Sequence, residues 1–185
     1  MRNHLCSKLL AAALSLCLLL TMLPLSALPV HAESTTYVLD VGELEDVGKG
    51  TKADGDTLKC GTDNFFTIFF SAKAQIQANE KTFSDGFSAT KRLHYGASTK
   101  IEDPVLNAIQ IKPTGPATVK IWWVSGDPNR GIGIYREDGT ILAQTSVASE
   151  KNQLSVSELS ISDAGTYYIG NVGGNNYHYK VLIES

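Results

Sequence analysis

The amino-acid sequence predicts an all-β protein, an antiparallel β-sandwich of the jelly-roll type. Apolar and β-branched residues come in short runs, and Gly, Asp, Asn and Pro separate one run from the next. No stretch keeps a 3.6-residue apolar period long enough for a substantial helix. We expect ten strands, at residues 37–41, 65–71, 88–95, 108–112, 118–124, 131–136, 140–145, 154–161, 166–171 and 177–184.

The first 32 residues have the layout of a secretory signal peptide. Arg2 and Lys8 precede an apolar run at 9–20, and Val-His-Ala at 30–32 resembles the small-residue site that a signal peptidase recognises. A retained membrane anchor is the alternative, but this run is shorter than the roughly 20 residues that span a bilayer. We therefore expect cleavage before Glu33 and a secreted, extracellular chain at 33–185. That chain should form a single β-sandwich domain with no membrane contact.

Composition excludes several classes of partner and site. The expected mature chain carries 14 basic and 19 acidic residues, a formal charge of −5. General attraction to nucleic acid or to anionic membranes is therefore not indicated. Cys60 is its only cysteine, which excludes an intramolecular disulfide and a cysteine-based metal site. We expect Cys60 to be buried as a small apolar residue.

Alternation along the strands assigns side chains to the two faces of each sheet. In one strand, Trp123 shares a face with Val119 and Ile121, whereas Trp122 shares the opposite face with Lys120. One of the two adjacent tryptophans is therefore expected in the core. By the same alternation Lys91 shares a face with Leu93, so either the strand bends or ends near Lys91 or its amine lies at the rim of the core with its stem buried.

Turn chemistry favours the same architecture. The Glu-Asp-Gly segment at 137–139 predicts a tight hairpin, because Asp-Gly supplies the positive φ that such turns require. The segment 163–167, Asp-Ala-Gly-Thr-Tyr, is typical of the tyrosine corner of sandwich domains, in which a Tyr hydroxyl caps nearby backbone. The charged, glycine-containing stretch 37–59 is predicted to be a long surface loop.

No catalytic constellation is visible in the mature chain. Its two histidines, His94 and His178, lie in no spacing that defines a hydrolase or a zinc enzyme. We therefore expect no enzymatic activity and no cofactor. The Asp-Gly-Asp segment at 54–56 could lend oxygens to a structural calcium ion, but the spacing is not that of an EF-hand and a solvated turn is favoured. Whether a metal binds stays open.

Several short sequence segments (phrases), taken in order, resemble the pectin-binding carbohydrate-binding modules (family 77-like) that are attached to bacterial pectate lyases. The phrases cover most of the mature chain. They are residues 61–68 (GTDNFFTI), 85–87 (DGF), 90–93 (TKRL), 108–111 (AIQI), 115–119 (GPATV), 122–123 (WW), 129–130 (NR) and 164–170 (AGTYYIG), followed by a Gly-Asn-rich final loop.

This resemblance implies a non-catalytic β-sandwich that binds an acidic plant polysaccharide such as pectin or homogalacturonan. Lysine and arginine would pair with galacturonate carboxylates, because charged donors form stronger hydrogen bonds to a carboxylate than neutral ones do. The matching phrases carry Lys91, Arg92 and Arg130 as candidate ligand-binding residues. Polar and aromatic neighbours complete the candidate set: Tyr95, Asn171, Asn175, Asn176 and Tyr177.

Other interpretations remain open at this point. The basic residues could solvate strand edges, and the Asn-rich tip could be turn chemistry, since Asn and Gly tolerate the left-handed conformation. An extracellular structural or adhesion sandwich, immunoglobulin-like and binding a protein partner, is the main functional alternative. A small polysaccharide lyase with a Lys or Arg base is a third. The pectin hypothesis requires its basic residues to gather in one patch, free of ion pairs.

Overall fold

A computed structural model describes residues 34–185, so the predicted signal peptide lies outside the described residues. Within this range the chain forms twelve strands and two short 3₁₀ turns. The strands are β1 (Thr36–Asp40), β2 (Thr57–Cys60), β3 (Phe66–Phe69), β4 (Gln75–Thr82), β5 (Ser88–His94), β6 (Ala108–Ile111), β7 (Ala117–Ser125), β8 (Gly131–Arg136), β9 (Ile141–Gln144), β10 (Leu154–Ile161), β11 (Tyr167–Val172) and β12 (Asn176–Glu184); the turns are η2 (Val41–Glu43) and η3 (Thr62–Asn64).

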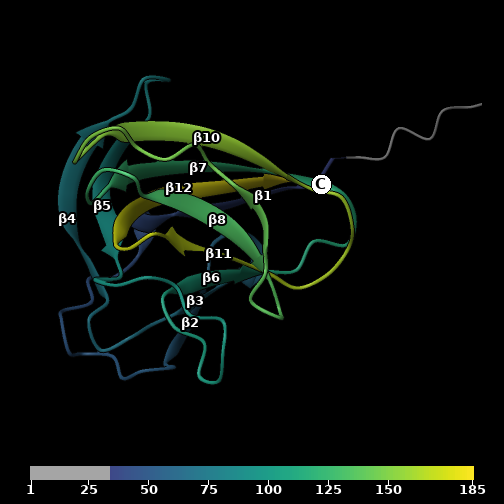
Figure 1. The fold of residues 1–185 in the computed structure, drawn as a ribbon, viewed down its shortest axis with the longest axis horizontal. Helices are drawn as coiled ribbons and strands as arrows, with labels where there is room; N and C mark the ends of the chain where they lie inside the picture. The colour runs from purple at the N-terminus through teal and green to yellow at the C-terminus, as the bar shows by residue number, and fades with distance from the viewer. Residues whose placement is uncertain (1–33) are drawn as a thin grey trace, which may run out of the picture. The chain divides into compact units, whose positions relative to one another are not determined.

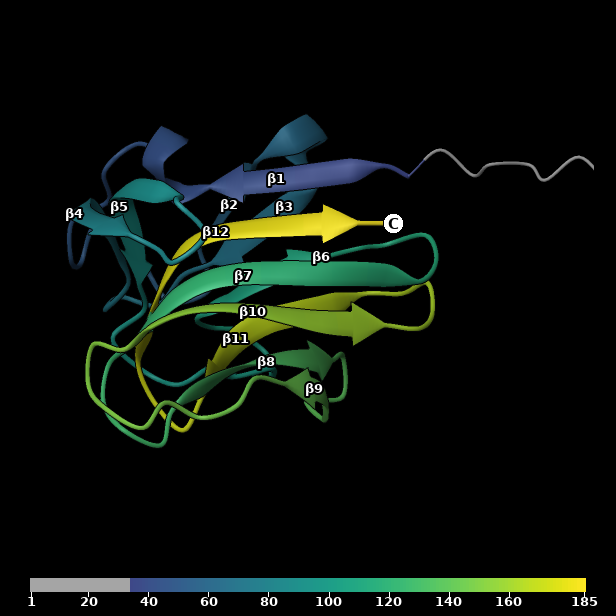
Figure 2. The same ribbon diagram turned by 90° about the horizontal axis from the view of Figure 1, so that it is seen from above.

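The strands form two antiparallel sheets of six strands, which confirms the predicted all-β sandwich. Sheet A has the order β10-β7-β12-β5-β4, and β1 also pairs with β12; sheet B has the order β2-β3-β6-β11-β8-β9. Figure 1 shows the two layers lying one over the other, with β10, β7 and β12 above β8, β11 and β6. In Figure 2, a view from above, β1, β12, β7 and β10 lie side by side.

Alternating side chains build the core between the sheets, as the sequence predicts. Val119, Ile121 and Trp123 of β7 are buried against sheet B, and the Trp123 indole donates to Ser157 Oγ at 3.1 Å. Trp122 faces the other way, into a separate apolar cluster on the outer side of sheet A. Cys60 is buried as expected, and burial raises the pKa of its thiol to about 11.

Two strands were not expected, and both lack the usual strand composition. β4 reads Gln-Ile-Gln-Ala-Asn-Glu-Lys-Thr, and Ile76 is its only buried residue. β2 begins inside the stretch 37–59, which predicts a surface loop, and ends at Cys60. That prediction is wrong in part, because Val47 is buried and bridges Ile76 by two backbone hydrogen bonds. Packing against neighbouring strands outweighs the weak local preference here.

Two predicted turns are present. Arg136 and Thr140 are joined by a backbone hydrogen bond across the β8–β9 hairpin, where Gly139 has a φ of 81°. Gly139 alone supplies the positive φ of this hairpin, so the turn is longer than a two-residue Asp-Gly turn. At the start of β11, the Tyr167 hydroxyl donates to the Asp163 carbonyl at 3.1 Å, as in a tyrosine corner.

Sheet A curves so that its last two strands leave the plane of the others. Figure 1 shows β4 and β5 running across the ends of β7, β10 and β12. The tip that joins β4 to β5 packs on the outer face of the sheet: the rings of Phe87 and Trp122 lie 5.7 Å apart, edge to face. Sheet curvature therefore brings β4 and β5 side chains beside those of β7 and β12.

Candidate functional site

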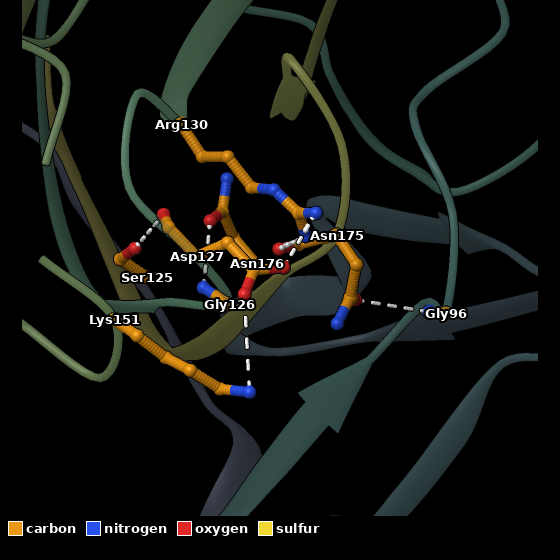
Figure 3. A network of polar contacts seen from close by, with 8 residues as sticks. All are labelled: Gly96, Ser125, Gly126, Asp127, Arg130, Lys151, Asn175 and Asn176. Atoms are coloured by element: carbon orange, nitrogen blue, oxygen red, sulfur yellow. Dashed lines mark hydrogen bonds and ion pairs between the residues drawn. The ribbon is translucent and has the colours of Figure 1, made fainter.

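Three of the predicted site residues meet where the β7–β8 and β11–β12 loops converge, and there they hold the loops together (Figure 3). Arg130 Nη2 lies 2.6 Å from Asp127 Oδ2, and Arg130 Nη1 donates to the Asn175 carbonyl at 2.8 Å. The Asn175 side chain in turn accepts from Gly96 N at 3.1 Å. Asn176 is fully buried and bonds the backbone on both sides of the loop.

Two more predicted residues are removed from solvent. Tyr95 is completely buried in the core, and Asn171 is 1% exposed. Asn171 Nδ2 donates to the Ala97 carbonyl, so its Oδ1 is the acceptor for His178 Nε2 at 2.9 Å. Burial lowers the pKa of His178 to about 3 and keeps the ring neutral. The side chains of Tyr95, Asn171 and Asn176 therefore have no free surface with which to contact a polysaccharide, and their prediction as ligand contacts is wrong.

Lys91 is also committed within the protein. Its amine donates to the Leu44 carbonyl at 2.6 Å and pairs with Asp46 at 3.0 Å. Of the two alternatives expected for Lys91, the rim position is the one observed, and the amine links the segment after η2 to β5. Lys91 and Arg130 therefore lie in separate ion pairs, and the patch predicted from Lys91, Arg92 and Arg130 does not form. The pectin hypothesis is wrong in that form, and a carboxylate site on this protein requires cations other than Lys91 and Arg130.

Arg92 differs from these two, because its guanidinium lies on an aromatic ring. The Arg92 Cζ is 4.2 Å from the centroid of the Tyr177 ring. With the Gln77 amide oriented to satisfy its neighbours, the Gln77 oxygen accepts from Arg92 Nε at 3.1 Å and from Nη2 at 2.7 Å. His94 packs edge-on to Tyr177 at 5.1 Å, and burial, together with the charges of Arg92 and Lys49, lowers the pKa of His94.

Two lysines lie on the same outer face, over the neighbouring strands. Lys180 Nζ of β12 is 5.0 Å from the Trp122 ring and 4.7 Å from the Phe87 ring. Lys120 Nζ of β7 is also 5.0 Å from the Trp122 ring. Trp122 is only 4% exposed, so its faces are covered rather than open to a sugar. We call the group Gln77, Phe87, Arg92, Lys120, Trp122, Tyr177 and Lys180 the cationic face.

One carboxylate of the protein already lies on the cationic face. Asp85, from the β4–β5 tip, accepts from the Trp122 indole at 3.0 Å and pairs with Lys120 at 3.5 Å. Desolvation alone would raise the pKa of Asp85, but the hydrogen bonds from Phe87 N and Trp122, with the charge of Lys120, hold it below its ordinary value. The indole N–H and the Lys120 amine together therefore stabilise a carboxylate at this position.

The other two cations of the cationic face lack such a partner. Within residues 34–185, no carboxylate oxygen lies within 4.0 Å of the Arg92 guanidinium or the Lys180 amine. Asp40 is the cross-strand neighbour of Lys180, but its side chain accepts from Gly42 N. Arg92 and Lys180 are thus the charges of this face that an external anion can pair with.

Sequence reasoning placed Arg92 and Tyr177 in the site and missed the lysines. The alternation that sends Trp122 outward also sends Lys120 outward, so that signal was present in the sequence. By simple alternation Tyr177 and Lys180 would lie on opposite faces, and they share the outer face because the register shifts between His178 and Lys180. That irregularity moves every later side chain of β12 by one position, and no local residue pattern announces it.

The chain shows no sign of a metal cluster in the part that the structure describes: no group of three or more His, Cys, Asp or Glu side chains in residues 34–185 is placed to hold an ion. Asp54 and Asp56 each accept a backbone N–H, from Ala72 and Ala53 respectively. In the same range, no helix is long and apolar enough to cross a bilayer.

No protein-family model and no curated protein matches the sequence. Among solved structures, the chain is similar to one from the Ruminococcus flavefaciens cellulosome, described in terms of glycan recognition, with 13% identity, a TM-score of 0.43 and coverage of 80% of this chain and 92% of that one. A carbohydrate-binding module of Cellvibrio mixtus lichenase 5A in complex with cellotriose has 11% identity, a TM-score of 0.33 and coverage of 58% and 86%.

A third likeness is to an arabinose-bound α-L-arabinofuranosidase, with 11% identity and a TM-score of 0.40. It covers 78% of this chain but only 25% of the enzyme. Likenesses as distant as these three concern the sandwich fold and carry no argument about ligand or activity. The case for function therefore depends on the side chains of the cationic face.

Proposed function

We propose that the protein is a non-catalytic, secreted module that binds an acidic plant polysaccharide of the pectic type on the cationic face. The observation that carries the proposal is the Arg92 guanidinium, whose Cζ lies 4.2 Å from the centroid of the Tyr177 ring and which has no carboxylate partner in the described chain. A uronate carboxylate would supply that partner. The signal-like first 32 residues support export, and the ordered sequence phrases support the pectic class.

The chemistry of Arg92 suits a carboxylate better than a neutral sugar. A guanidinium presents paired N–H donors in one plane, which matches the two oxygens of a carboxylate. Tyr177 and Gln77 restrict the rotation of the side chain, so less conformational entropy is lost when an anion binds. Lys180 offers a second positive charge on the next strand, over the Trp122 ring.

Asp85 occupies the donors of Lys120 and Trp122, so an external carboxylate has Arg92 and Lys180 to pair with. The expected mature chain has a net charge of −5, so long-range attraction to a polyanion is absent. Binding should therefore depend on short-range pairing, which salt weakens because exposed charges are screened over roughly 8 to 10 Å.

Affinity electrophoresis on gels that contain different glycans tests the proposal. Polygalacturonate should slow the protein, whereas fully methyl-esterified pectin and neutral galactan should not, because esterification removes the carboxylate charge. Added salt should reduce the retardation. Equal retardation by the esterified and the acidic polymer would contradict a carboxylate site. Absorbance of unsaturated uronides after incubation with polygalacturonate would contradict the non-catalytic part.

A further inference from the structure

Strand β2 ends sheet B, and one of its edges pairs with no strand of the described chain. Hydrogen-bonded and non-bonded residue pairs alternate along an antiparallel ladder. Phe70 N donates to the Asp56 carbonyl at 2.8 Å, so Leu58 and Cys60 bond toward β3 by the same alternation. The backbone N–H and C=O groups of Thr57 and Lys59 therefore face the open edge.

Two adjoining hollows run beside this edge. They have volumes of about 430 and 500 Å³ and share four lining residues, Glu43, Leu44, Lys59 and Cys60. Their far side is the segment that follows β1, which is held in place by the ion pair of Lys91 with Asp46 and by the Val47–Ile76 bridge. A fixed wall thus lies opposite an open strand edge, with apolar side chains between them.

The charges around the two hollows are mostly negative. Asp40, Glu43, Glu45 and Asp46 line them, against Lys52 and Lys59. No Lys or Arg nitrogen of residues 34–185 lies within 4.0 Å of the carboxylates of Glu43 or Glu45. A second copy of the chain would bring the same carboxylates to the interface, so the charges favour a basic partner over self-association.

We propose that the open edge of β2 binds an extended, basic segment of a partner protein, which adds to sheet B as an antiparallel strand. Side chains in line with Leu58 and Cys60 would point toward the hollows, and those in line with Thr57 and Lys59 would point away. Because carboxylates line the hollows, the segment carries Lys or Arg at the positions that point toward them and apolar residues at the positions between. Main-chain bonds supply affinity in such strand addition, and the hollows supply selectivity.

A synthetic peptide, acetyl-Lys-Val-Lys-Val-Lys-Val-Lys-amide, tests this inference on the whole protein. Peptide binding should slow hydrogen exchange at the amides of Thr57 and Lys59, and leave that of Leu58 unchanged because it already bonds to β3. In this register the peptide's valine N–H groups face β2, because the valines are in line with Thr57 and Lys59. Backbone N-methylation of two valines should abolish binding, whereas the same change at the two interior lysines should not.

A variant of the edge provides the matching test on the protein. Lys59→Pro removes a donor that faces the open edge, and edge positions tolerate proline. It should weaken peptide binding about tenfold, whereas Lys59→Gln, which keeps the N–H, should not weaken it. The same peptide with glutamate in place of lysine should not bind. Absence of saturable binding, unchanged exchange at Thr57 and Lys59, or equal binding of both methylated peptides would each overturn the inference, whatever the glycan experiments show.

Discussion

Two arginines that the sequence offers as candidate ligand contacts have opposite structural roles. Arg130, at the convergence of the loops, pairs with Asp127 and donates to the Asn175 carbonyl. Arg92, on the outer face of sheet A, lies on Tyr177 and bonds a neutral amide. Both are half-buried, so exposure does not separate them. The difference is the acidic partner, which the fold places beside Arg130 and not beside Arg92.

This contrast explains why the residues of the predicted binding patch lie in two separate regions with different roles. At the convergence of the loops, polar side chains satisfy the backbone of segments that have no sheet neighbours, because a buried N–H or C=O without a partner is costly. Within sheet A the strands satisfy one another's backbone, so side chains on the outer face are available for other contacts. We therefore expect substitutions in the first region to change stability and those in the second to change binding.

Arg92→Gln should have the largest effect on binding. The change removes the charge and the paired donors while the side chain still reaches across Tyr177. Affinity for polygalacturonate should fall about thirtyfold, equivalent to about 2 kcal/mol. Arg136→Gln, at an exposed arginine of sheet B, is the matched control and should bind like the wild type. Titration by calorimetry measures both; equal losses in the two variants would remove the distinction between the regions.

Arg130→Ala should mainly reduce stability. It breaks the ion pair with Asp127 and leaves the Asn175 carbonyl without its donor, so the free energy of unfolding should fall by about 2 kcal/mol. Denaturant unfolding measures this loss. Lys151→Ala removes only the longer 3.8 Å pair with Asp127 and should change little. A folded Arg130→Ala protein that no longer binds polygalacturonate would place this arginine in the ligand site after all.

His178 makes the loop region sensitive to acid. Its pKa is about 3 in the folded protein and near 6.5 when exposed, so between these values the unfolded chain binds more protons. Stability contributed by the neutral imidazole should therefore fall as the pH drops below about 6.5, by at most about 1.4 kcal/mol per pH unit. His178→Gln should show a shallower loss from pH 6.5 to 4. Parallel unfolding curves for the two proteins would contradict this account.

Asp85→Asn should produce the smallest change in binding, and the change should be a gain in affinity. Asparagine can still accept from the Trp122 indole but no longer neutralises Lys120, so an external carboxylate meets less competition. Affinity for polygalacturonate should rise about threefold. Glu158→Gln, at the cross-strand neighbour of Lys120, is the control for a general change in charge. A larger gain from Glu158→Gln than from Asp85→Asn would show that net charge, and not the Asp85 contact, limits binding.

Much of the sandwich could be predicted because local patterns and the fold agree. The β7 alternation separates Trp123 in the core from Trp122 on the outer face, and Gly139 closes the hairpin it was expected to close. β2 and β4 could not be predicted in this way, since their polar residues resemble loop and become strands only against β3 and β5. Of the candidate site residues, Arg92 and Tyr177 lie in contact on the outer face of sheet A, whereas Tyr95 faces the core.

The sequence by itself determined the fold class, the faces of the long strands and the supply of basic and polar residues, because these depend on periodicity and turn chemistry within a few neighbours. The tertiary structure alone decided which cations are available. Asp46 and Asp85 reach Lys91 and Lys120 from segments distant in the chain, whereas Asp127 and Arg130 lie in one loop, which turns their side chains toward each other. A charge is neutralised by whatever lies within a few ångströms in space, and that neighbourhood is set by strand pairing and sheet curvature.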